Sequence, residues 1–249
     1  MCELLAMSSQ FPATVNLSLQ VLAEHGGHSA PYADGWGIAY YDDYDIVRVR
    51  DARPAWQNPW VDFIEQEGFP SRLVLAQIRR ASQGSPAIKN TQPFCRELGG
   101  RVHTFAHNGD MPEVSRSIAP LPNSYRPIGD TDSETAFCSL LERLRPTWLA
   151  GVPDFGARLQ IVSEFAIALR QFGNANFIYS DGDFLFAHSD KRVRYDSDAP
   201  TPGLTWLCRT CEGQTERVEG PGLSIHSPQQ RVAIVASVPL TDEPWQPLT

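Results

Sequence analysis

The sequence has no apolar stretch long enough to cross a membrane and no recognisable secretory leader. A membrane-spanning helix needs roughly 18–20 consecutive apolar residues, and no run of that length occurs in the 249 residues. The N-terminus, Met1-Cys2-Glu3-Leu4, also lacks a basic region followed by an apolar one. We therefore expect a cytoplasmic protein without a membrane partner.

Positive charge is scarce. Lys and Arg number 21 against 29 Asp and Glu, which gives a net charge of −8 and a pI near 5.2. Nucleic acids and anionic membranes bind basic surfaces, so this balance argues against either as the main partner. The hydrophobic fraction of 42% is that of a globular chain rather than a disordered one. A small molecule or another protein is left as the expected partner.

Cysteines are few and do not form the dense, even set of a disulfide-rich secreted domain. There are five, so we expect reduced thiols. Cys208 and Cys211 form the one closely spaced pair, but a zinc site needs four ligands and only His226 lies nearby. We interpret the pair as local packing in a strand rather than a redox or metal site, and we predict no metal.

Twenty prolines and 18 glycines divide the chain into short segments and leave little room for long helices. Strands are predicted at Leu73–Ile78, Val102–Ala106, Asn176–Tyr179, Phe184–Ala187 and Val232–Ser237. Helices are predicted at Leu17–Ala23, Glu134–Leu144 and Phe155–Phe172. The apolar face of the second is formed by Phe137, Leu140, Leu141 and Leu144, and that of the third by Leu159, Val162, Phe165, Ala166 and Leu169. Asp181-Gly182 predicts a hairpin turn. Without βαβ alternation, this order favours one α+β domain over residues 1–249.

Cys2 is one methionine away from the first position. If Met1 is removed, Cys2 carries both a thiol and an α-amine, whose reference pKa is about 7.7–8.0. Such an amine can take the thiol proton directly or through one water, so no histidine is needed. The alternative is that Cys2 is a small buried apolar residue, and Cys2 alone does not decide between the two.

Short segments along the chain bear on that choice. They are Met1–Leu5, Asp34–Gly37, Arg79–Gly84, Asn90–Phe94, Ala106–Gly109 and Gly129–Glu134. In composition, order and spacing they resemble the class II glutamine amidotransferases, in which an N-terminal cysteine cleaves the side-chain amide of glutamine. The stretch Ala236–Thr241, followed by Trp245, resembles the end of the stand-alone YafJ-like branch of that family.

The resemblance implies a four-layer αββα N-terminal-nucleophile hydrolase sandwich, with two stacked antiparallel sheets and helices outside. It also implies that no metal or organic cofactor is needed. Because this glutaminase-type domain takes up the whole sequence, any acceptor for ammonia would be on another protein.

By the resemblance, the Asn108 side-chain amide and the Gly109 backbone N–H bind the oxyanion formed during amide cleavage. An ordinary Asn-Gly turn is the alternative; for the oxyanion role we expect unusual backbone angles and a close approach at Gly109. Arg79 and Asp132 would bind the α-carboxylate and α-ammonium of the substrate. Strand alternation from Leu73 predicts that Arg79 and Arg80 face opposite sides of the sheet, and the resemblance, through Ala81 and Ser82, implies that Arg79 is the one that faces inward.

Asp132 has a second interpretation, because Thr131-Asp132-Ser133-Glu134 leads into a helix and several of these residues could cap it. We expect Asp130 or Thr131 to cap the helix and Asp132 to bind. His107 is interpreted as structural.

Asp34–Gly37 is interpreted as architectural, its glycines allowing the backbone to approach Cys2. Gln77, Ser82 and Gln92 stand where larger amidotransferases usually carry His, Thr and His. His25 and His28 either border the pocket entrance or are solvated loop residues.

Three functions are consistent with these residues. The first, which we favour, is hydrolysis of the γ-amide of glutamine or of a γ-glutamyl conjugate. The second is a glutaminase subunit that supplies ammonia to a partner synthetase. The third is a γ-glutamyl-binding module without catalytic activity, which the presence of Cys2, Arg79, Asn108, Gly109 and Asp132 makes less attractive.

Overall fold

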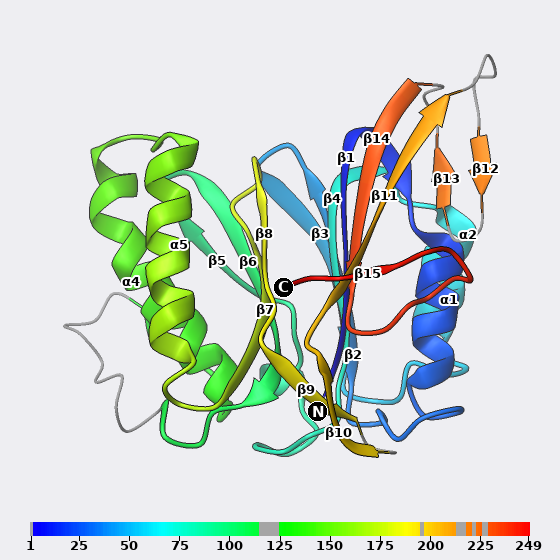
Figure 1. Cartoon of the computed structure of the whole chain (residues 1–249), viewed down its shortest axis with the longest axis horizontal. Coiled ribbons are helices and arrows are strands. Elements are labelled where there is room, and N and C mark those ends of the chain that lie inside the picture. The colour runs from blue at the N-terminus through cyan, green and yellow to red at the C-terminus, as the bar shows by residue number, and fades with distance from the viewer. Residues whose placement is uncertain (1, 115–124, 195–196, 213–217, 221–222, 226–228) are drawn as a thin grey trace.

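The computed structural model describes residues 2–114, 125–194, 197–212, 218–220, 223–225 and 229–249. Two antiparallel sheets face each other, and helices cover the outer face of each (Figure 1). This α+β arrangement of four layers is the αββα sandwich that the sequence predicts.

The larger sheet has the strand order β15-β11-β14-β1-β4-β2-β3, and the β12–β13 hairpin joins it through β1. Its strands are β1 (Glu3–Thr14), β2 (Trp36–Asp42), β3 (Asp45–Asp51), β4 (Ser71–Ile78), β11 (Thr205–Glu212), β12 (Val218–Gly220), β13 (Leu223–Ile225), β14 (Gln229–Ala236) and β15 (Gln246–Pro247). The predicted strands at Leu73–Ile78 and Val232–Ser237 correspond to β4 and β14. The central position of β1 places the N-terminal segment between β14 and β4.

The second sheet has the order β5-β6-β7-β8. Its strands are β5 (Phe94–Leu98), β6 (Arg101–Asp110), β7 (Asn174–Ser180) and β8 (Leu185–His188), and a separate hairpin pairs β9 (Lys191–Arg194) with β10 (Ser197–Pro202). The predicted hairpin is confirmed, since β7 pairs antiparallel with β8 and Gly182 between them has a φ of +90°.

Helices α1 (Asn16–His25) and α2 (Pro59–Glu67) cover the larger sheet, and α4 (Asp132–Ala150) and α5 (Phe155–Leu169) cover the other. The expectation of short helices is wrong for α4, which runs for 19 residues and continues through Pro146. Leu144 and Trp148 lie one turn apart and are both buried in the core beneath α4. Their packing offsets the backbone hydrogen bond that proline cannot donate.

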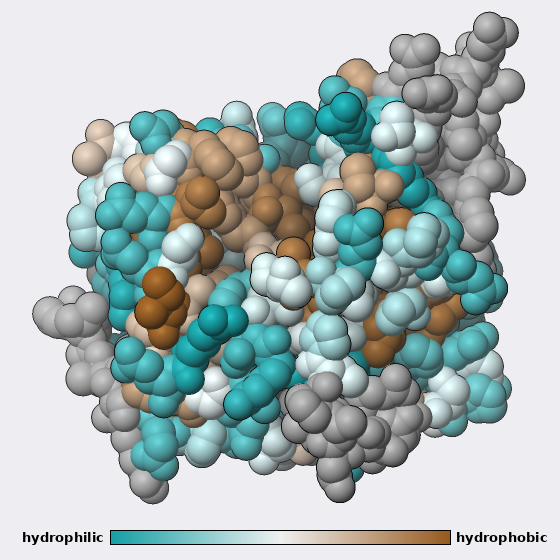
Figure 2. Space-filling view, in the orientation of Figure 1, coloured by the Kyte–Doolittle hydropathy of each residue, from teal (hydrophilic) through white to brown (hydrophobic). Residues whose placement is uncertain are grey.

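Helix α5 buries Val162, Phe165 and Leu169 as predicted, but Leu159 is 42% exposed and the assignment of Leu159 to the buried face is wrong. Four more apolar residues of α4, α5 and the loop between these helices are also exposed: Leu149, Val152, Phe155 and Ile167. Figure 2 shows apolar surface on the side of the molecule where α4 and α5 lie.

Alternation along β1 decides which side chains enter the space between the sheets. Leu4 and Ala6 pack into the core between the two sheets, whereas Leu5 and Met7 pack on the side of α1. On β4, Leu75 shares the core between the sheets. Neither α1, α2, α4 nor α5 is long and apolar enough to cross a membrane, and these are the α-helices in the described part of the chain.

Candidate functional site

Cys2 lies at the beginning of β1, beside the end of β4. Glu3 pairs with Ile78 in the antiparallel register, and one step beyond this pair are Cys2 and Arg79. The Cys2 thiol is partly buried, with its Sγ 3.7 Å from the carbonyl oxygen of Arg80. The N-terminal segment therefore meets the Arg79 segment, as the candidate site requires.

Burial raises the pKa of the Cys2 thiol above its ordinary value. The positive charge of Arg79 opposes this rise, and the negative charge of Asp132 adds to it. Arg79 thus adjoins Cys2 in the strand register, and the charges of both Arg79 and Asp132 act on the thiol. A raised pKa also leaves the thiol protonated near neutral pH, so a nucleophile here needs a base.

Arg79 is 3% exposed whereas Arg80 is exposed, which confirms the predicted alternation. The Arg79 guanidinium donates to four backbone carbonyls: Nη1 to Asp34 at 3.3 Å and Ser85 at 3.1 Å, Nη2 to Gln83 at 2.7 Å and Gly84 at 2.9 Å. In this arrangement Arg79 holds the loop that follows it. A substrate carboxylate that takes both terminal nitrogens has to replace some of these carbonyls.

The segment before β2 supports the Arg79 main chain. The Asp34 N–H donates to the Arg79 carbonyl at 3.0 Å, and the Arg79 N–H donates to the Gly35 carbonyl at 2.8 Å. The Asp34 carboxylate accepts from Ala81 N–H at 2.8 Å. Asp34–Gly37 is thus architectural, as predicted.

We expected the glycines of Asp34–Gly37 to let the backbone approach Cys2, and this expectation is wrong. A Cβ on Gly37 would lie 2.2 Å from the carbonyl oxygen of Gln92, and one on Gly35 would lie 2.9 Å from the Thr91 hydroxyl. These glycines therefore admit the segment at residues 91–92 rather than Cys2.

Asp132 is the first residue of α4 but does not cap it. The cap is Thr131, whose hydroxyl accepts from Glu134 N–H at 3.2 Å, so one of the two predicted caps is confirmed. The buried Asp132 carboxylate accepts from Met111 N–H at 2.8 Å and from Ser133 N–H at 2.7 Å. Asp132 therefore connects the start of α4 to the chain just after β6.

Asn108 and Gly109 lie within β6, opposite Asn176 and Ala175 of β7, so the Asn-Gly turn considered from the sequence is wrong. The expectation of unusual backbone angles is also wrong, because Gly109 is not among the glycines with positive φ. The expected close approach is present: a Cβ on Gly109 would lie 1.8 Å from the Asn174 carbonyl oxygen.

The Asn108 side chain is fully buried, and its Nδ2 donates to Ser237 Oγ at 3.1 Å. Within the described part of the chain, its Oδ1 has no hydrogen-bond partner. The Asn108 carbonyl oxygen accepts from Asn176 Nδ2 at 3.0 Å. The amide thus retains hydrogen-bonding capacity that the described residues do not use.

His107 is buried, in agreement with the structural role expected for it. Its Nδ1 lies 2.9 Å from Ser133 Oγ, and its backbone N–H donates to Gln92 Oε1 at 2.6 Å. Burial lowers the pKa of His107, and the Asp132 charge opposes that change. Gln77 Nε2 donates to the His107 carbonyl at 3.5 Å, so Gln77 and Gln92 both support β6.

Sequence reasoning missed a buried ion pair next to Cys2. Glu3 is 3% exposed, and its carboxylate accepts from Arg192 Nη2 at 2.9 Å and from His25 Nδ1 at 2.7 Å. Tyr32 contacts the same guanidinium at 3.0 Å. No short-range pattern reports this cluster, because its members come from β1, the end of α1, the loop after it and β9.

A cavity of about 380 Å³ adjoins this cluster, and its lining includes Glu3, His25, Tyr32, Arg192, Val238 and Pro239. His25 thus borders a pocket beside Glu3, but none of the predicted site residues lines this pocket, so a position of His25 at the entrance of the active site stays a prediction. His28 stacks on Trp56. Hydrogen bonding to Glu3 raises the pKa of His25, although burial opposes the rise.

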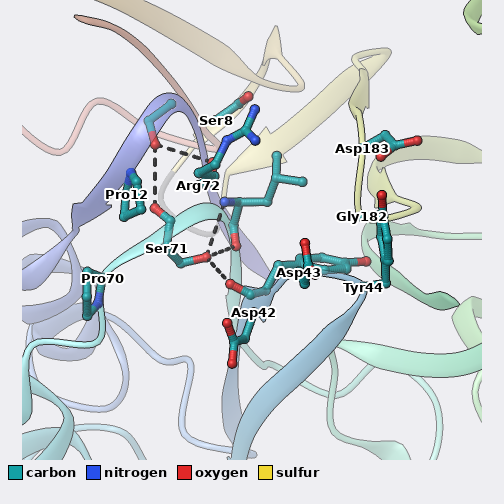
Figure 3. A pocket seen from close by; sticks show the side chains of 13 residues that line it. Ser8, Pro12, Asp42, Asp43, Tyr44, Pro70, Ser71, Arg72, Gly182 and Asp183 are labelled. Carbon is teal, nitrogen blue, oxygen red and sulfur yellow. Dashed lines mark hydrogen bonds between the residues drawn. The ribbon is translucent and has the colours of Figure 1, made fainter. Parts of the chain in front are cut away.

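A second cavity, of about 240 Å³, lies at the other end of β1 and is drawn in Figure 3. The hydroxyl of Ser71, which lines this cavity, is used in a hydrogen bond of the fold, since it donates to the Tyr41 carbonyl at 2.7 Å. Tyr44 and Asp183 line the pocket on the right of that view. This cavity contains none of the predicted site residues.

Cys208 lies on β11, in the strand expected for it, but it is exposed, so the local packing expected for this residue is wrong. Cys138 is buried. The Cys211 side chain, His226 and Met1 lie outside the residues whose placement is described. Among those that are described, no group of three or more His, Cys, Asp or Glu side chains is arranged to hold a metal ion.

Comparison with known proteins gives matches over the whole chain. The family model described as "Glutamine amidotransferases class-II" matches residues 1–249. The chain is 34% identical to YafJ of Escherichia coli (strain K12), over 99% of this chain and 93% of that protein.

Two further similarities bear on fold and chemistry. The 2.0 Å crystal structure of a predicted glutamine amidotransferase from Pseudomonas aeruginosa PA01 superposes with a TM-score of 0.67 at 30% identity, covering 98% of this chain and 93% of that one. A gamma-glutamyl-hercynylcysteine sulfoxide hydrolase of Mycobacterium tuberculosis (strain CDC 1551 / Oshkosh) is 30% identical over 55% of this chain and 57% of its own length.

Proposed function

The chain belongs to the class II glutamine amidotransferases, with the N-terminal-nucleophile hydrolase fold, and we propose that it hydrolyses the γ-amide of glutamine or of a γ-glutamyl conjugate. The observation that carries this proposal is the meeting of Cys2, Arg79 and Asp132. The charges of Arg79 and Asp132 act on a thiol at the first strand of the chain. Free glutamate is the common product of either substrate.

In the proposed reaction, the Cys2 sulfur attacks the γ-carbonyl carbon and forms a C–S bond. The thiol proton passes to the Cys2 α-amine, which becomes available once Met1 has been removed. Collapse of the tetrahedral intermediate breaks the C–N bond, and the α-ammonium returns the proton to the leaving nitrogen. Water then cleaves the thioester and releases glutamate, which restores the thiol.

The raised pKa of Cys2 supports a role for an adjacent base, because the thiol does not ionise by itself near neutral pH. An amine on the same residue is available without any other side chain being brought into place. His25 is already hydrogen-bonded to Glu3, on the side of the sheet occupied by α1.

Asn108 and Gly109, near the end of β6, are proposed to donate hydrogen bonds to the oxyanion. Asn108 Nδ2 carries two N–H groups and donates one of them to Ser237 Oγ, so the second N–H supports this role, because donors fixed in a water-excluded site stabilise developing charge most strongly. Close packing of β7 against Gly109 supports a fixed position for its backbone N–H.

Arg79 and Asp132 are proposed to recognise the amino-acid end of the substrate. A substrate α-carboxylate would exchange with loop carbonyls on the Arg79 guanidinium, and the loop of residues 80–85 would rearrange around it. The Asp132 carboxylate would attract the α-ammonium while it keeps its bond from Met111. One cation and one anion then select a free amino acid at the γ-glutamyl end.

Similarity to a γ-glutamyl conjugate hydrolase favours a conjugate over free glutamine as the preferred substrate. The same pocket would also serve a glutaminase subunit that supplies ammonia to a separate synthetase. The two proposals differ in the leaving group that is accepted best.

The decisive experiment measures glutamate release from a panel of γ-glutamyl amides and from glutamine, using protein that begins at Cys2. A conjugate turned over faster than glutamine supports the hydrolase, and a preference for glutamine supports the ammonia-supplying subunit. Cys2→Ala should abolish release, whereas Cys208→Ala should retain it. Release that persists in Cys2→Ala excludes the proposed nucleophile.

A further inference from the structure

Ser237 directly follows β14, in the stretch Ala236–Thr241, to which the proposed reaction assigns no role. It is 4% exposed, and its N–H, its carbonyl and its hydroxyl all form hydrogen bonds. These bonds reach β1, β6 and β9, three strands that are distant in sequence. A serine with this many separate partners connects elements rather than filling space.

Two of the bonds hold β1 close to its beginning. The Ser237 N–H donates to the Leu4 carbonyl at 3.0 Å, and the Leu4 N–H donates to Ser237 Oγ at 3.0 Å. Leu4 is two residues from Cys2, so these bonds limit the movement of the segment that carries the thiol.

A third bond orients the side chain of Asn108. Its Nδ2 donates to Ser237 Oγ at 3.1 Å, and its Oδ1 has no partner within the described residues. The terminal torsion of an asparagine is soft, so a hydrogen bond is needed to set which way its amide faces. The orientation matters, because an oxyanion is attracted by N–H and repelled by C=O.

The fourth bond anchors Ser237 itself. Arg192 Nη1 donates to the Ser237 carbonyl at 3.0 Å, while Nη2 of the same guanidinium bonds to Glu3 Oε1 at 2.9 Å. Glu3 is the covalent neighbour of Cys2. Through Arg192, Ser237 is therefore connected to the nucleophile segment a second time.

We propose that Ser237 is a positioning residue whose hydroxyl orients the Asn108 amide toward the oxyanion. Its main chain meanwhile keeps β1, and therefore Cys2, in register with that amide. The inference rests on the proposed function, because it requires Cys2 and Asn108 to act on the same carbonyl group. Ser237 itself contacts no substrate atom.

Ser237→Ala removes the hydroxyl, and with it the bonds from Asn108 Nδ2 and Leu4 N–H, but it leaves the main-chain bonds to the Leu4 carbonyl and from Arg192 in place. We expect kcat to fall by roughly ten- to a hundredfold, less than the loss of an oxyanion donor itself, with KM changed by no more than about twofold. Ser237→Thr retains the hydroxyl and should recover most of kcat, whereas Ser237→Val, which has nearly the same shape, should not. If the alanine variant folds poorly, comparing Ser237→Thr with Ser237→Val still tests whether the hydroxyl is needed for kcat.

Ser71→Ala provides a matched control. Ser71 is also a buried serine of the larger sheet, and its hydroxyl accepts from Leu73 N–H at 3.2 Å and donates to Tyr41, but it lies at the opposite end of β4. Its loss should lower the melting temperature by an amount similar to that of Ser237→Ala and leave kcat unchanged.

Labelling of Cys2 separates the orientation of the amide from the position of the thiol. A glutamine-like diazoketone presents a carbonyl to the oxyanion donors, whereas iodoacetamide alkylates a thiol without such help. Ser237→Ala should slow diazoketone labelling by at least about fivefold and leave the iodoacetamide rate unchanged. An equal loss with both reagents would mean that the thiol has moved, and would overturn the orienting role.

The proposed function and the role of Ser237 can fail separately. If wild-type protein beginning at Cys2 releases no glutamate and is not labelled by the diazoketone, the proposed function fails and the role of Ser237 fails with it. If wild type is active and Ser237→Ala has the same kcat and labelling rate, the role of Ser237 alone is overturned.

Discussion

Arg192 Nη2 lies 2.9 Å from Glu3 Oε1, although 189 residues separate the two in sequence. Both side chains are almost completely buried, and Glu3 also binds His25. Burying charges costs free energy unless they are paired and hydrogen-bonded, so this cluster is stable only when it is complete. Its completeness is coupled to the position of Cys2, the next residue in the chain.

Arg192→Met should therefore destabilise the fold strongly. It leaves the Glu3 carboxylate buried with His25 as its remaining ion-pair partner, and breaking a buried pair in this way costs about 3–5 kcal/mol. Urea unfolding measures the loss. Arg53→Met, which removes the exposed partner of Asp51, should leave the free energy of unfolding nearly unchanged. Equal effects of the two variants would contradict the buried pairing.

The same cluster predicts how stability depends on pH. Hydrogen bonding to Glu3 raises the pKa of His25 in the folded state, so the folded protein holds this proton more tightly than the unfolded chain. That contribution is complete below about pH 6.5, the ordinary histidine value, and is lost as pH rises through the folded-state pKa. Burial opposes ionisation of Glu3, but the His25 bond and the Arg192 charge prevail and lower its pKa, so its contribution is lost at acidic pH.

Unfolding of wild type and His25→Gln across pH 5–9 provides the measurement. The decline in stability above about pH 6.5 should be smaller in the variant, because glutamine has no proton to release. His28→Gln is the control, since His28 stacks on Trp56 and forms no ion pair with Glu3. A decline of the same size in His25→Gln would show that another group causes it.

Arg79→Lys should impair activity, whereas Arg80→Lys should be nearly silent. The Arg79 guanidinium serves four carbonyls through two terminal nitrogens, and a lysine ammonium cannot reproduce that planar arrangement. A penalty of about 1–3 kcal/mol in transition-state stabilisation is expected, measured as kcat/KM for glutamate release. If the two variants exchange behaviour, the recognition role belongs to Arg80 instead.

Thr131 and Asp132 are neighbours in the chain, but substitution of Thr131 should affect stability and substitution of Asp132 should affect substrate recognition. Thr131→Ala removes the cap of α4 and should cost about 1 kcal/mol of stability with KM unchanged. Asp132→Asn retains an oxygen that can accept from Met111 N–H but removes the charge, so it should raise KM at least about tenfold. An Asp132→Asn enzyme with wild-type KM would exclude Asp132 from ammonium binding.

Gly109→Ala should disrupt the pairing of β6 with β7. The new Cβ would lie 1.8 Å from the Asn174 carbonyl oxygen, so the strands must separate, and an overpacking cost of about 1–3 kcal/mol is expected together with loss of activity. Gly156→Ala is the control, because the nearest atom to its Cβ is 3.4 Å away and the position lies in α5. That variant should be stabilised by up to about 1 kcal/mol, as measured by thermal unfolding.

The part of this architecture that sequence predicts is the part encoded locally. Alternation continued past β4 predicts that Arg79 and Arg80 face opposite sides, and the family resemblance adds that Arg79 faces inward. The helical spacing of Phe137, Leu140 and Leu144 predicts the buried face of α4. Gly109 shows the limit of such reasoning. A glycine after asparagine resembles a turn, but here it is required by a strand that arrives from 65 residues further along the chain.

The cluster around Glu3 was missed for a related reason. A glutamate at the third position has no pattern that reports a partner at Arg192, and pairing of this kind exists only after β1, β9 and α1 have packed. Motif matching proposed Cys2, Asn108 and Asp132 as site residues, whereas the bonds that Ser237 forms with Asn108 and with Leu4 became visible only in the structure.

The final prediction concerns the removal of Met1, which lies outside the residues that the structure describes. A retained Met1 converts the Cys2 nitrogen into an amide, which is not basic near neutral pH, so the proposed reaction loses its base. Burial raises the pKa of the thiol, and ionisation without a base therefore cannot compensate. Intact-mass analysis and glutamate release should co-vary across preparations: those that begin at Cys2 are active, and those that begin at Met1 are not. Equal turnover by a homogeneous Met1 form would exclude the α-amine as the base, and His25, the histidine nearest to Cys2 in the sequence, would be the next residue to replace.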